Sequence, residues 1–463
     1  MDKNATELSG MDLIEGDLFD IDQLRSFAAL IQTGSKKQVL HDIEGLHESD
    51  VAELITLLPA DLRESFIRLV GSELPPEVFA ELDAGLLSDV VEYMDLATLA
   101  SAVQELDSDD AVFLLEDMDE ADQKEVLDQI PESDRRVLER ALDYREDSAG
   151  RLMRHDYVAV PPFWTVGQTI DFLREDRNLP DEFLEIFVVE PTHRPSGVVQ
   201  LNQVLRASRS QVMGEIRDED FTAVNVETDR EQVARLFERY NLFSVAVVDS
   251  DQRMIGVITA DDVLEVITEE AGEDILRLGG VSGDATVTDS VLSAARGRFP
   301  WLLVNLATAI VASIVIALFD GSIEKMVALA ILMPIVASMG GNAGTQTLTI
   351  AVRGLATREL VSANARRIVM RELGIGLING VLFALVGGLI AGLWFQDIWI
   401  GMILGAAMII TLVIAALSGI LIPLGLDKIG VDPAVASSVF VTTVTDVIGF
   451  LAFLGFATFF LLS

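Results

Sequence analysis

Five long apolar stretches in the last third of the chain limit its fold more than any other feature. At 1.5 Å of rise per residue, each can cross the roughly 30 Å of hydrocarbon in a bilayer as an α-helix. So many stretches of this length are not expected of core helices in a soluble protein. We therefore predict a five-helix transmembrane domain over residues 300–463, with spans at Trp301–Phe319, Met326–Ala351, Leu373–Leu393, Ile398–Leu424 and Ala434–Leu462.

Charge divides the chain at the same place. Residues 300–463 hold eight acidic and seven basic residues, so they contribute −1 to the net charge of −40, and residues 1–299 contribute −39. Such a surface repels the phosphates of nucleic acids and favours dissolved cations as ligands. A second interpretation stays open, because six lysines against 27 arginines is a balance also found in proteins that stay solvated in a salty cytoplasm.

The basic residues beside the spans predict the topology. Seven arginines flank the start of the first span or fill the loop between the second and third, while the opposite loops hold one basic residue: Arg296, Arg298, Arg353, Arg358, Arg366, Arg367 and Arg371. By the positive-inside rule the N-terminus is cytosolic and the C-terminus is outside. The first 17 residues lack the features of a cleaved signal. We expect a multi-pass protein of the inner (plasma) membrane, surrounded by membrane lipid.

The cytosolic part begins with a predicted all-α region, residues 1–140. Apolar residues recur at helical spacing in Val51–Leu58, Leu99–Leu106 and Ala111–Met118, with Asp, Ser and Pro signals between them. No strand pattern intervenes. We expect an acidic superhelix of short helices, which usually serves docking or gating.

Residues 141–271 contain an internal repeat of strand, helix, two strands and helix. The predicted elements are 157–161, Val166–Glu175, Ile186–Glu190, Gly197–Leu201 and a helix from Asn202, then Thr222–Val226, Glu231–Tyr240, Ser244–Asp249 and the strand-to-helix segment GVITADD at 256–262. This α/β pattern resembles a tandem pair of CBS domains, at 141–210 and 211–271. That resemblance implies a regulatory ligand, often an adenine nucleotide such as ATP, between the copies. A connecting helix at 272–299 is expected to follow.

Asp446 is the one ionised side chain well inside a predicted span. Placing a carboxylate there costs about 2.5–3.5 kcal/mol on the mildest scales, so such residues normally face a water-filled path or a partner charge. No Lys, Arg or His lies within another predicted span. Ser438, Thr442 and Gly449 share a helical stripe with Asp446, which favours a cation site. The alternative is a protonated acid held against a neighbouring helix.

The second span carries a polar, glycine-rich segment, Met339–Thr347. Small residues such as Gly340 and Gly344 are typical of close helix packing, but packing does not explain Asn342, Thr345 and Gln346. We interpret the segment as a polar pore lining whose backbone is broken or closely packed. All candidate ligands are oxygens, which favours Mg2+ or Ca2+. Mg2+ would be held through its water shell, and Mn2+ and Co2+ remain open.

Several motifs in one order resemble the MgtE family of magnesium transporters. They are RFPWL at 298–302, GGNAGTQ at 340–346, RGLA at 353–356, VDPA at 431–434 and TDVIG at 445–449. The resemblance covers nearly the whole chain. It implies a helical N-domain, tandem CBS domains, a connecting "plug" helix and five spans.

The resemblance also implies site residues. It implies a homodimer whose pore lies between the second and fifth spans of both subunits, with Asp446 at the central ion site and Gly341, Asn342, Gly344 and Thr442 beside it. Cytosolic Mg2+ would bridge acidic faces and hold the pore shut. The acids implied for that role are Asp109, Asp110, Asp261, Asp262, Glu270, Glu273, Asp274 and Asp432.

We therefore expect a Mg2+-selective channel gated by its own ion. One alternative is an exchanger or a carrier for other divalent cations. Another is a membrane-bound nucleotide sensor without transport, although such a sensor has no need of Asp446. An enzyme is not expected, because the four histidines form no nucleophile or zinc-ligand pattern.

Overall fold

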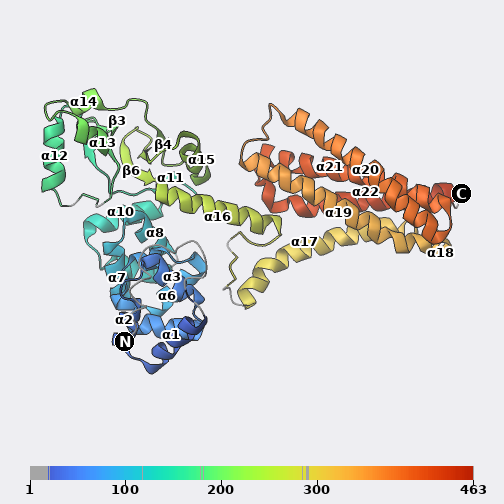
Figure 1. Cartoon of the computed structure of the whole chain (residues 1–463), viewed down its shortest axis with the longest axis horizontal. Helices are drawn as coiled ribbons and strands as arrows, with labels where there is room; N and C mark the ends of the chain where they lie inside the picture. Colours follow the sequence, from blue (N-terminus) through green and yellow to red (C-terminus); the bar gives the residue numbers. More distant parts are fainter. Residues whose placement is uncertain are drawn as a thin grey trace. The chain divides into compact units, whose positions relative to one another are not determined.

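The chain is described by a computed structural model over residues 19, 21–116, 118–177, 179–180, 182–283, 285–287 and 291–461 (Figure 1). Residues 1–18 of the expected N-domain, and with them the segment examined for a signal, lie outside this part. The described residues fall into two compact units that divide between Glu269 and Glu270.

The first unit begins with a stack of short helices around one apolar core, in which Phe66, Leu54 and Leu114 are fully buried. The three helices predicted from apolar spacing are confirmed to within three residues at each end. Two of them, α3 and α8, begin earlier than predicted because their first turns are polar, and α7 begins three residues earlier, directly after its N-cap Asp95. The elements are α1 Ile21–Thr33, α2 Lys36–Ile43, α3 Glu48–Leu57, α4 Ala60–Val70, the 3-10 turn η1 Gly71–Glu73, α5 Glu77–Ala80, α6 Ala84–Tyr93, α7 Leu96–Glu105, α8 Ser108–Glu116, α9 Glu120–Leu127 and α10 Glu132–Leu142.

The predicted repeat is confirmed by two three-stranded sheets, β1-β2-β3 and β4-β5-β6. In each, the first pair is parallel, the second is antiparallel, and the register shifts at the equivalent place. The elements are α11 Ala149–Leu152, β1 Ala159–Val160, α12 Val166–Glu175, β2 Glu185–Val189, β3 Pro195–Gln200, α13 Leu201–Arg206, α14 Met213–Ile216, β4 Ala223–Asn225, α15 Arg230–Tyr240, β5 Ser244–Val248, β6 Met254–Thr259 and α16 Ala260–Leu278.

Strand alternation joins the two copies. Ile186 and Val188 point into the core of the first copy, while Phe187 between them packs with Ala246 and Val257 of the second. Successive side chains of a strand lie on opposite faces, so each sheet contributes one face to its own core and the other to the shared contact.

The prediction of one connecting helix at 272–299 is wrong, because two helices share this range. Helix α16 begins in the second CBS copy and continues to Leu278, and α17 begins only at Val291. Gly279 and Gly280 separate them, and Gly280 has φ +72°. This left-handed conformation is accessible to glycine without strain and ends a helix.

The second unit contains five helices long and apolar enough to cross a membrane, which confirms the predicted number of spans. They are α17 Val291–Ala317, α19 Val327–Ala356, α20 Ala365–Phe395, α21 Ile398–Lys428 and α22 Pro433–Leu461, with the short α18 Asp320–Lys325 between the first two. The predicted end of the fifth span, Leu462, lies outside the described residues.

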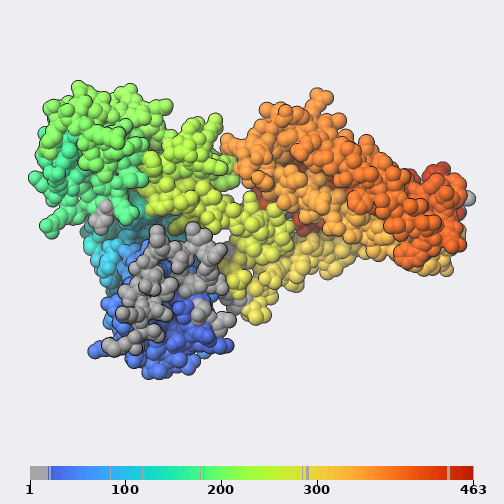
Figure 2. All heavy atoms as spheres, in the orientation of Figure 1, coloured from blue at the N-terminus to red at the C-terminus, as the bar shows by residue number. Residues whose placement is uncertain are grey.

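Helix α21 lies at the centre of this unit. It packs against α19, α20 and α22, and on the face shown in Figure 2 the atoms of α19 and α20 cover most of α21 and α22. Glycine permits this closeness: a Cβ at Gly401 would lie 2.4 Å from the carbonyl oxygen of Gly388 on α20. The side chains of α17 and α20 are largely exposed within the single chain.

Candidate functional site

Gly340 and Gly344 bring α19 against its neighbours. A Cβ at Gly340 would lie 2.6 Å from Cγ2 of Thr411, and one at Gly344 would lie 2.5 Å from Cγ1 of Val441. Both glycines are buried. The predicted close packing is therefore confirmed, whereas the alternative of broken backbone is wrong, because α19 is continuous through the segment.

The adjacent residues of α19 lie on a different face. A Cβ at Gly341 would meet nothing within 4 Å. The side chain of Asn342 is exposed and donates to Oγ of Ser338 at 3.4 Å. These two predicted pore residues thus remain accessible in the single chain.

Gly344 lies on the packed face of α19. Its carbonyl oxygen would lie 2.7 Å from a Cβ placed on Gly419 of α21, so the absence of a side chain at 419 admits the α19 backbone. The expected main-chain contact of Gly344 with the ion stays a prediction.

Helix α22 presents Asp446 and Thr442 away from its packed face. Thr445 is fully buried against α19, but Thr442 is exposed and Asp446 is half-buried. Among the described residues Asp446 has no hydrogen bond and no ion pair. The hydroxyl of Thr442 donates to the carbonyl of Ser438 at 2.9 Å, which leaves the lone pairs of its oxygen free to accept. Gly449 is buried against Thr411, so it belongs to the packed face.

Buried polar groups of the membrane unit escaped the sequence analysis, among them Glu372 and Thr411. Glu372 is 3% exposed and lies one turn before Gly376, which packs on α21. It was missed because hydropathy placed the start of the third span at Leu373, whereas α20 begins at Ala365. The hydroxyl of Thr411 on α21 is buried without a partner among the described residues.

In the first unit, Arg154 gathers four carboxylates. Its Nε donates to Asp109 at 2.9 Å and its Nη1 to Asp107 at 2.7 Å, while Nη2 donates to Asp261 at 3.0 Å and to Asp262 at 2.5 Å. Three of these four were predicted as Mg2+-sensing acids. No group of three or more His, Cys, Asp or Glu side chains is arranged to hold a metal ion in the part of the chain described here.

Three acids of this region, Asp109, Asp110 and Glu265, have raised pKa values. Burial first, and then the Asp262 carboxylate, raise the pKa of Asp109 well above its ordinary value, against the effect of Arg154. Burial raises the pKa of Asp110 to about 6. Burial and the nearby Asp110 raise the pKa of Glu265 to about 7. Glu265 was missed, although it follows Asp262 by three residues on one face of α16.

Arg277 pairs with two of the predicted acids of the second unit. It forms ion pairs with Glu273, four residues earlier on α16, and with Asp432. The other carboxylate oxygen of Asp432 accepts from the backbone N–H of Ala434 at 2.8 Å, at the start of α22. Glu270 and Asp274 lie on the same helix as Glu273 and are partly buried.

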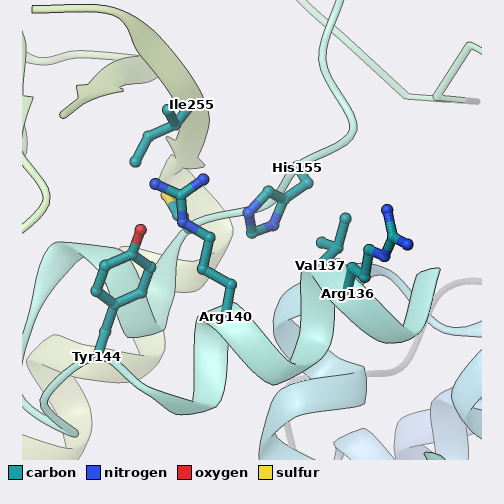
Figure 3. A pocket seen from close by; sticks show the side chains of 7 residues that line it. Arg136, Val137, Arg140, Tyr144, His155 and Ile255 are labelled. Carbon is teal, nitrogen blue, oxygen red and sulfur yellow. The ribbon is translucent and has the colours of Figure 1, made fainter. Parts of the chain in front are cut away.

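A cavity of about 260 Å3 separates α10 from β6 (Figure 3). Its lining residues are Arg136, Val137, Arg140, Tyr144, Met153, His155 and Ile255. Burial, with a smaller effect of Arg140, lowers the pKa of His155 to about 4, so its ring is neutral at pH 7. In Figure 3 the guanidinium of Arg140 extends from α10 toward Ile255. The cavity thus offers a cation beside apolar walls.

Family models match three parts of the chain. A model described as "Divalent cation transporter" matches residues 333–456, one described as "MgtE intracellular N domain" matches 46–147, and a CBS domain model matches 213–269. A magnesium transporter MgtE of Thermus thermophilus is 35% identical over 331 residues, covering 70% of this chain and 72% of that protein. The chain belongs to the MgtE family of magnesium transporters. The expected resemblance is thereby confirmed.

Two other proteins are similar to this MgtE family member. A magnesium transporter MgtE of Bacillus subtilis is 29% identical and covers 71% of this chain and 73% of its own length. A solved cytosolic domain of the Mg2+ channel MgtE in complex with ATP is 28% identical, with a TM-score of 0.49, and covers 52% of this chain and 99% of that one. The family is one of membrane transporters, and the five apolar helices make this member a multi-pass membrane protein.

Proposed function

We propose that this MgtE family member is a Mg2+-selective channel of the inner (plasma) membrane, formed by a homodimer and closed by cytosolic Mg2+. The observation that carries the proposal is Asp446. Its carboxylate lies within a membrane helix, half-buried, without a hydrogen bond or an ion pair among the described residues. An acid in such a place requires water, a cation or another subunit.

The ion path runs along the uncovered faces of α19 and α22. Asp446 supplies the charge, and Thr442, Gly341 and Asn342 supply polar groups that this chain leaves accessible. Two subunits with these faces opposed contribute two carboxylates to one Mg2+. Because Mg2+ loses its waters reluctantly, these groups bind it through its water shell.

Cytosolic Mg2+ closes the pore by relieving repulsion between acids. Asp110 and Glu265 in the first unit have carboxylate neighbours that help to raise their pKa. In the second unit Glu273 and Asp432 both pair with Arg277, and Glu270 and Asp274 lie on the same helix as Glu273. A divalent cation exchanges their repulsion for shared oxygen ligands. The state that binds Mg2+ more tightly is favoured as Mg2+ rises, and this state is the closed one.

The topology follows the charges of the loops. Five arginines between 353 and 371 place the α19–α20 connection in the cytosol, together with both acidic regions. The C-terminus is then outside. An introduced cysteine near Ser322, in the opposite loop of this cysteine-free chain, should react with an impermeant thiol reagent added to intact cells, whereas one near Arg358 should not.

An adenine nucleotide is the second ligand of this proposal. CBS pairs commonly bind such ligands, and the cavity beside Arg140 and Tyr144 adds a cationic, partly aromatic surface. Calorimetry with ATP on the parent and on Arg140→Ala decides whether this cavity takes part. Unchanged affinity in the variant would locate the nucleotide elsewhere in the CBS pair.

Conductance separates the channel from its rivals. The purified protein in a planar bilayer, with Mg2+ as the sole charge carrier, should give a current that reverses at the Mg2+ equilibrium potential. An exchanger needs a second ion, so its current would not reverse at this potential, and a carrier would lack the unitary current steps of a channel. A nucleotide sensor without transport would show neither current nor Mg2+ uptake into a Mg2+-starved strain.

A further inference from the structure

We propose that Arg154 is a resident cation that holds the N-terminal helices against the CBS pair, so that this junction stays closed without Mg2+. Its guanidinium bonds Asp107 and Asp109 on one side and Asp261 and Asp262 on the other. The first two acids belong to the N-terminal helices, at the start of α8. The other two belong to the first turn of α16, at the end of the CBS pair.

Backbone hydrogen bonds fix the position of Arg154. Its N–H donates to the carbonyl of Val257 at 2.7 Å, and its carbonyl accepts from the N–H of Val257 at 2.9 Å. This bridge ties it to β6. The next residue, His155, donates its backbone N–H to Oγ of Ser108 at 2.8 Å, on the facing helix α8. The guanidinium is therefore presented to both sets of acids from a rigid base.

The acids are also held in position. Oδ2 of Asp262 accepts from the backbone N–H of Thr259 at 3.0 Å and from its hydroxyl at 2.6 Å, while Oδ1 accepts from Arg154. The side chains of Asp109 and Asp262 are only 10% and 6% exposed. Carboxylates this deeply buried need a partner charge. Arg154 supplies it, and its charge is permanent at any physiological pH.

The guanidinium competes with a divalent cation for this position, although Oδ1 of Asp109 is buried without a hydrogen bond among the described residues. Nε, Nη1 and Nη2 of the guanidinium occupy oxygens of all four acids at 2.5–3.0 Å. We infer that Asp109, Asp261 and Asp262 are structural partners of Arg154, in contrast to their expected role as Mg2+ ligands. Mg2+ would then act on the neighbouring Asp110 and Glu265. The role given to Mg2+ here rests on the proposed gating function, but the role of Arg154 does not.

The test is amide hydrogen exchange of α8 in the full-length protein, in chelator and in millimolar Mg2+ at constant KCl. The parent should protect α8 equally in both. Arg154→Met keeps the length of the side chain and loses its charge, so α8 should exchange at least about tenfold faster in chelator. Mg2+ should restore protection in this variant, because the freed carboxylates then accept a divalent cation.

Matched variants make the result specific. Arg154→Lys keeps the charge but loses the planar fork, and should show a partial effect. Arg174→Met removes an exposed arginine of α12 and should resemble the parent. If Arg154→Met does not fold, Asp107→Asn and Asp261→Asn remove the charges of the two more exposed partners. Each should speed the exchange of α8 in chelator but not in Mg2+.

Two results would overturn the proposal. One is a parent whose α8 is protected only in Mg2+. The other is unchanged exchange in both Arg154→Met and the two aspartate variants. Mg2+ uptake measured on the same preparations tests the proposed function separately. If the parent takes up no Mg2+, transport is refuted, but the conclusion from hydrogen exchange is not affected.

Discussion

Arg277 forms ion pairs with both Glu273 and Asp432, and so joins the last turns of α16 to the start of α22. Asp432 lies 155 residues after Arg277 and also caps α22. Asp446 follows on the same helix, about 21 Å along its axis at 1.5 Å per residue. These ion pairs connect the C-terminal end of α16 to the helix that carries the proposed ion site.

Breaking this connection should favour the open channel. Neutralising Asp432 alone, or Glu270, Glu273 and Asp274 together, should leave a channel that conducts at Mg2+ levels that silence the parent, because the closed state loses its ligands. Patch recordings over a range of cytosolic Mg2+ measure the closing concentration, with Asp427→Asn as control. Closure at the parent's concentration in every variant would rule out these sensor residues.

Asp446 should be essential for conduction but not for folding. Asp446→Ala and Asp446→Asn should each reduce Mg2+ transport at least about a hundredfold, because one carboxylate per subunit is lost from a water-lined path, while expression and dimer content stay unchanged. Asp427→Asn, at the exposed end of α21, provides the matched control. Near-parental uptake by both Asp446 variants would remove this residue from the pore.

Alanine variants of Gly340 and Gly341 should distinguish a role in helix packing from a role in conduction. Gly340→Ala places a methyl group 2.6 Å from Thr411 and 3.2 Å from Thr445, and overpacking of this kind costs about 1–3 kcal/mol. Gly341→Ala meets nothing within 4 Å, so its thermal unfolding in detergent should match the parent. If Gly341 lines the path, conduction alone should fall in that variant. Equal destabilisation by both would contradict the described packing.

The acidity of the cytosolic region has two interpretations that limited proteolysis distinguishes. If the acids sense Mg2+ specifically, millimolar Mg2+ should protect the protease cleavage sites around α16 from digestion, whereas KCl at matched ionic strength should not. Adaptation to a salty cytoplasm predicts equal protection by both, because screening depends on ionic strength. Trypsin and Glu-C digestion of the full-length protein in each salt provides the measurement.

Without Mg2+, the stability of the unit that contains Asp110 and Glu265 should depend on pH. Burial and like-charged neighbours raise the pKa of Asp110 to about 6 and that of Glu265 to about 7. Groups with raised pKa favour the folded cytosolic unit when protonated, and this contribution is lost as pH rises through about 6 to 7. In chelator, stability should therefore fall from pH 5 to pH 8.

Mg2+ competes with these protons, so the Mg2+ concentration that half-maximally raises the thermal stability of the unit should rise as pH falls from about 8 to 5. Glu265→Gln should flatten this dependence, since it removes the group with the higher pKa. Glu238→Gln on α15 leaves the cluster intact and serves as control. A protective concentration independent of pH in the parent would exclude Asp110 and Glu265 as ligands.

The sequence by itself determined the features that depend on local pattern. Span length and hydropathy were sufficient for five membrane helices, and the repeated order of strands and helices was sufficient for the two matching sheets. Asp446 could be singled out because a charge in an apolar stretch is costly wherever the neighbouring helices lie. The packing role of Gly340 followed from the general use of small residues between membrane helices.

Only the tertiary structure decided which acids are already neutralised. Arg154 meets carboxylates 45 to 108 residues away, and Arg277 meets one 155 residues away, so no local pattern indicates either arrangement. Gly341 and Gly344 lie three residues apart in one motif, yet Gly344 packs against α21 whereas a Cβ on Gly341 would meet nothing within 4 Å. The reason is physical: sequence spacing fixes the face of a helix, but which neighbour covers that face depends on how the helices pack.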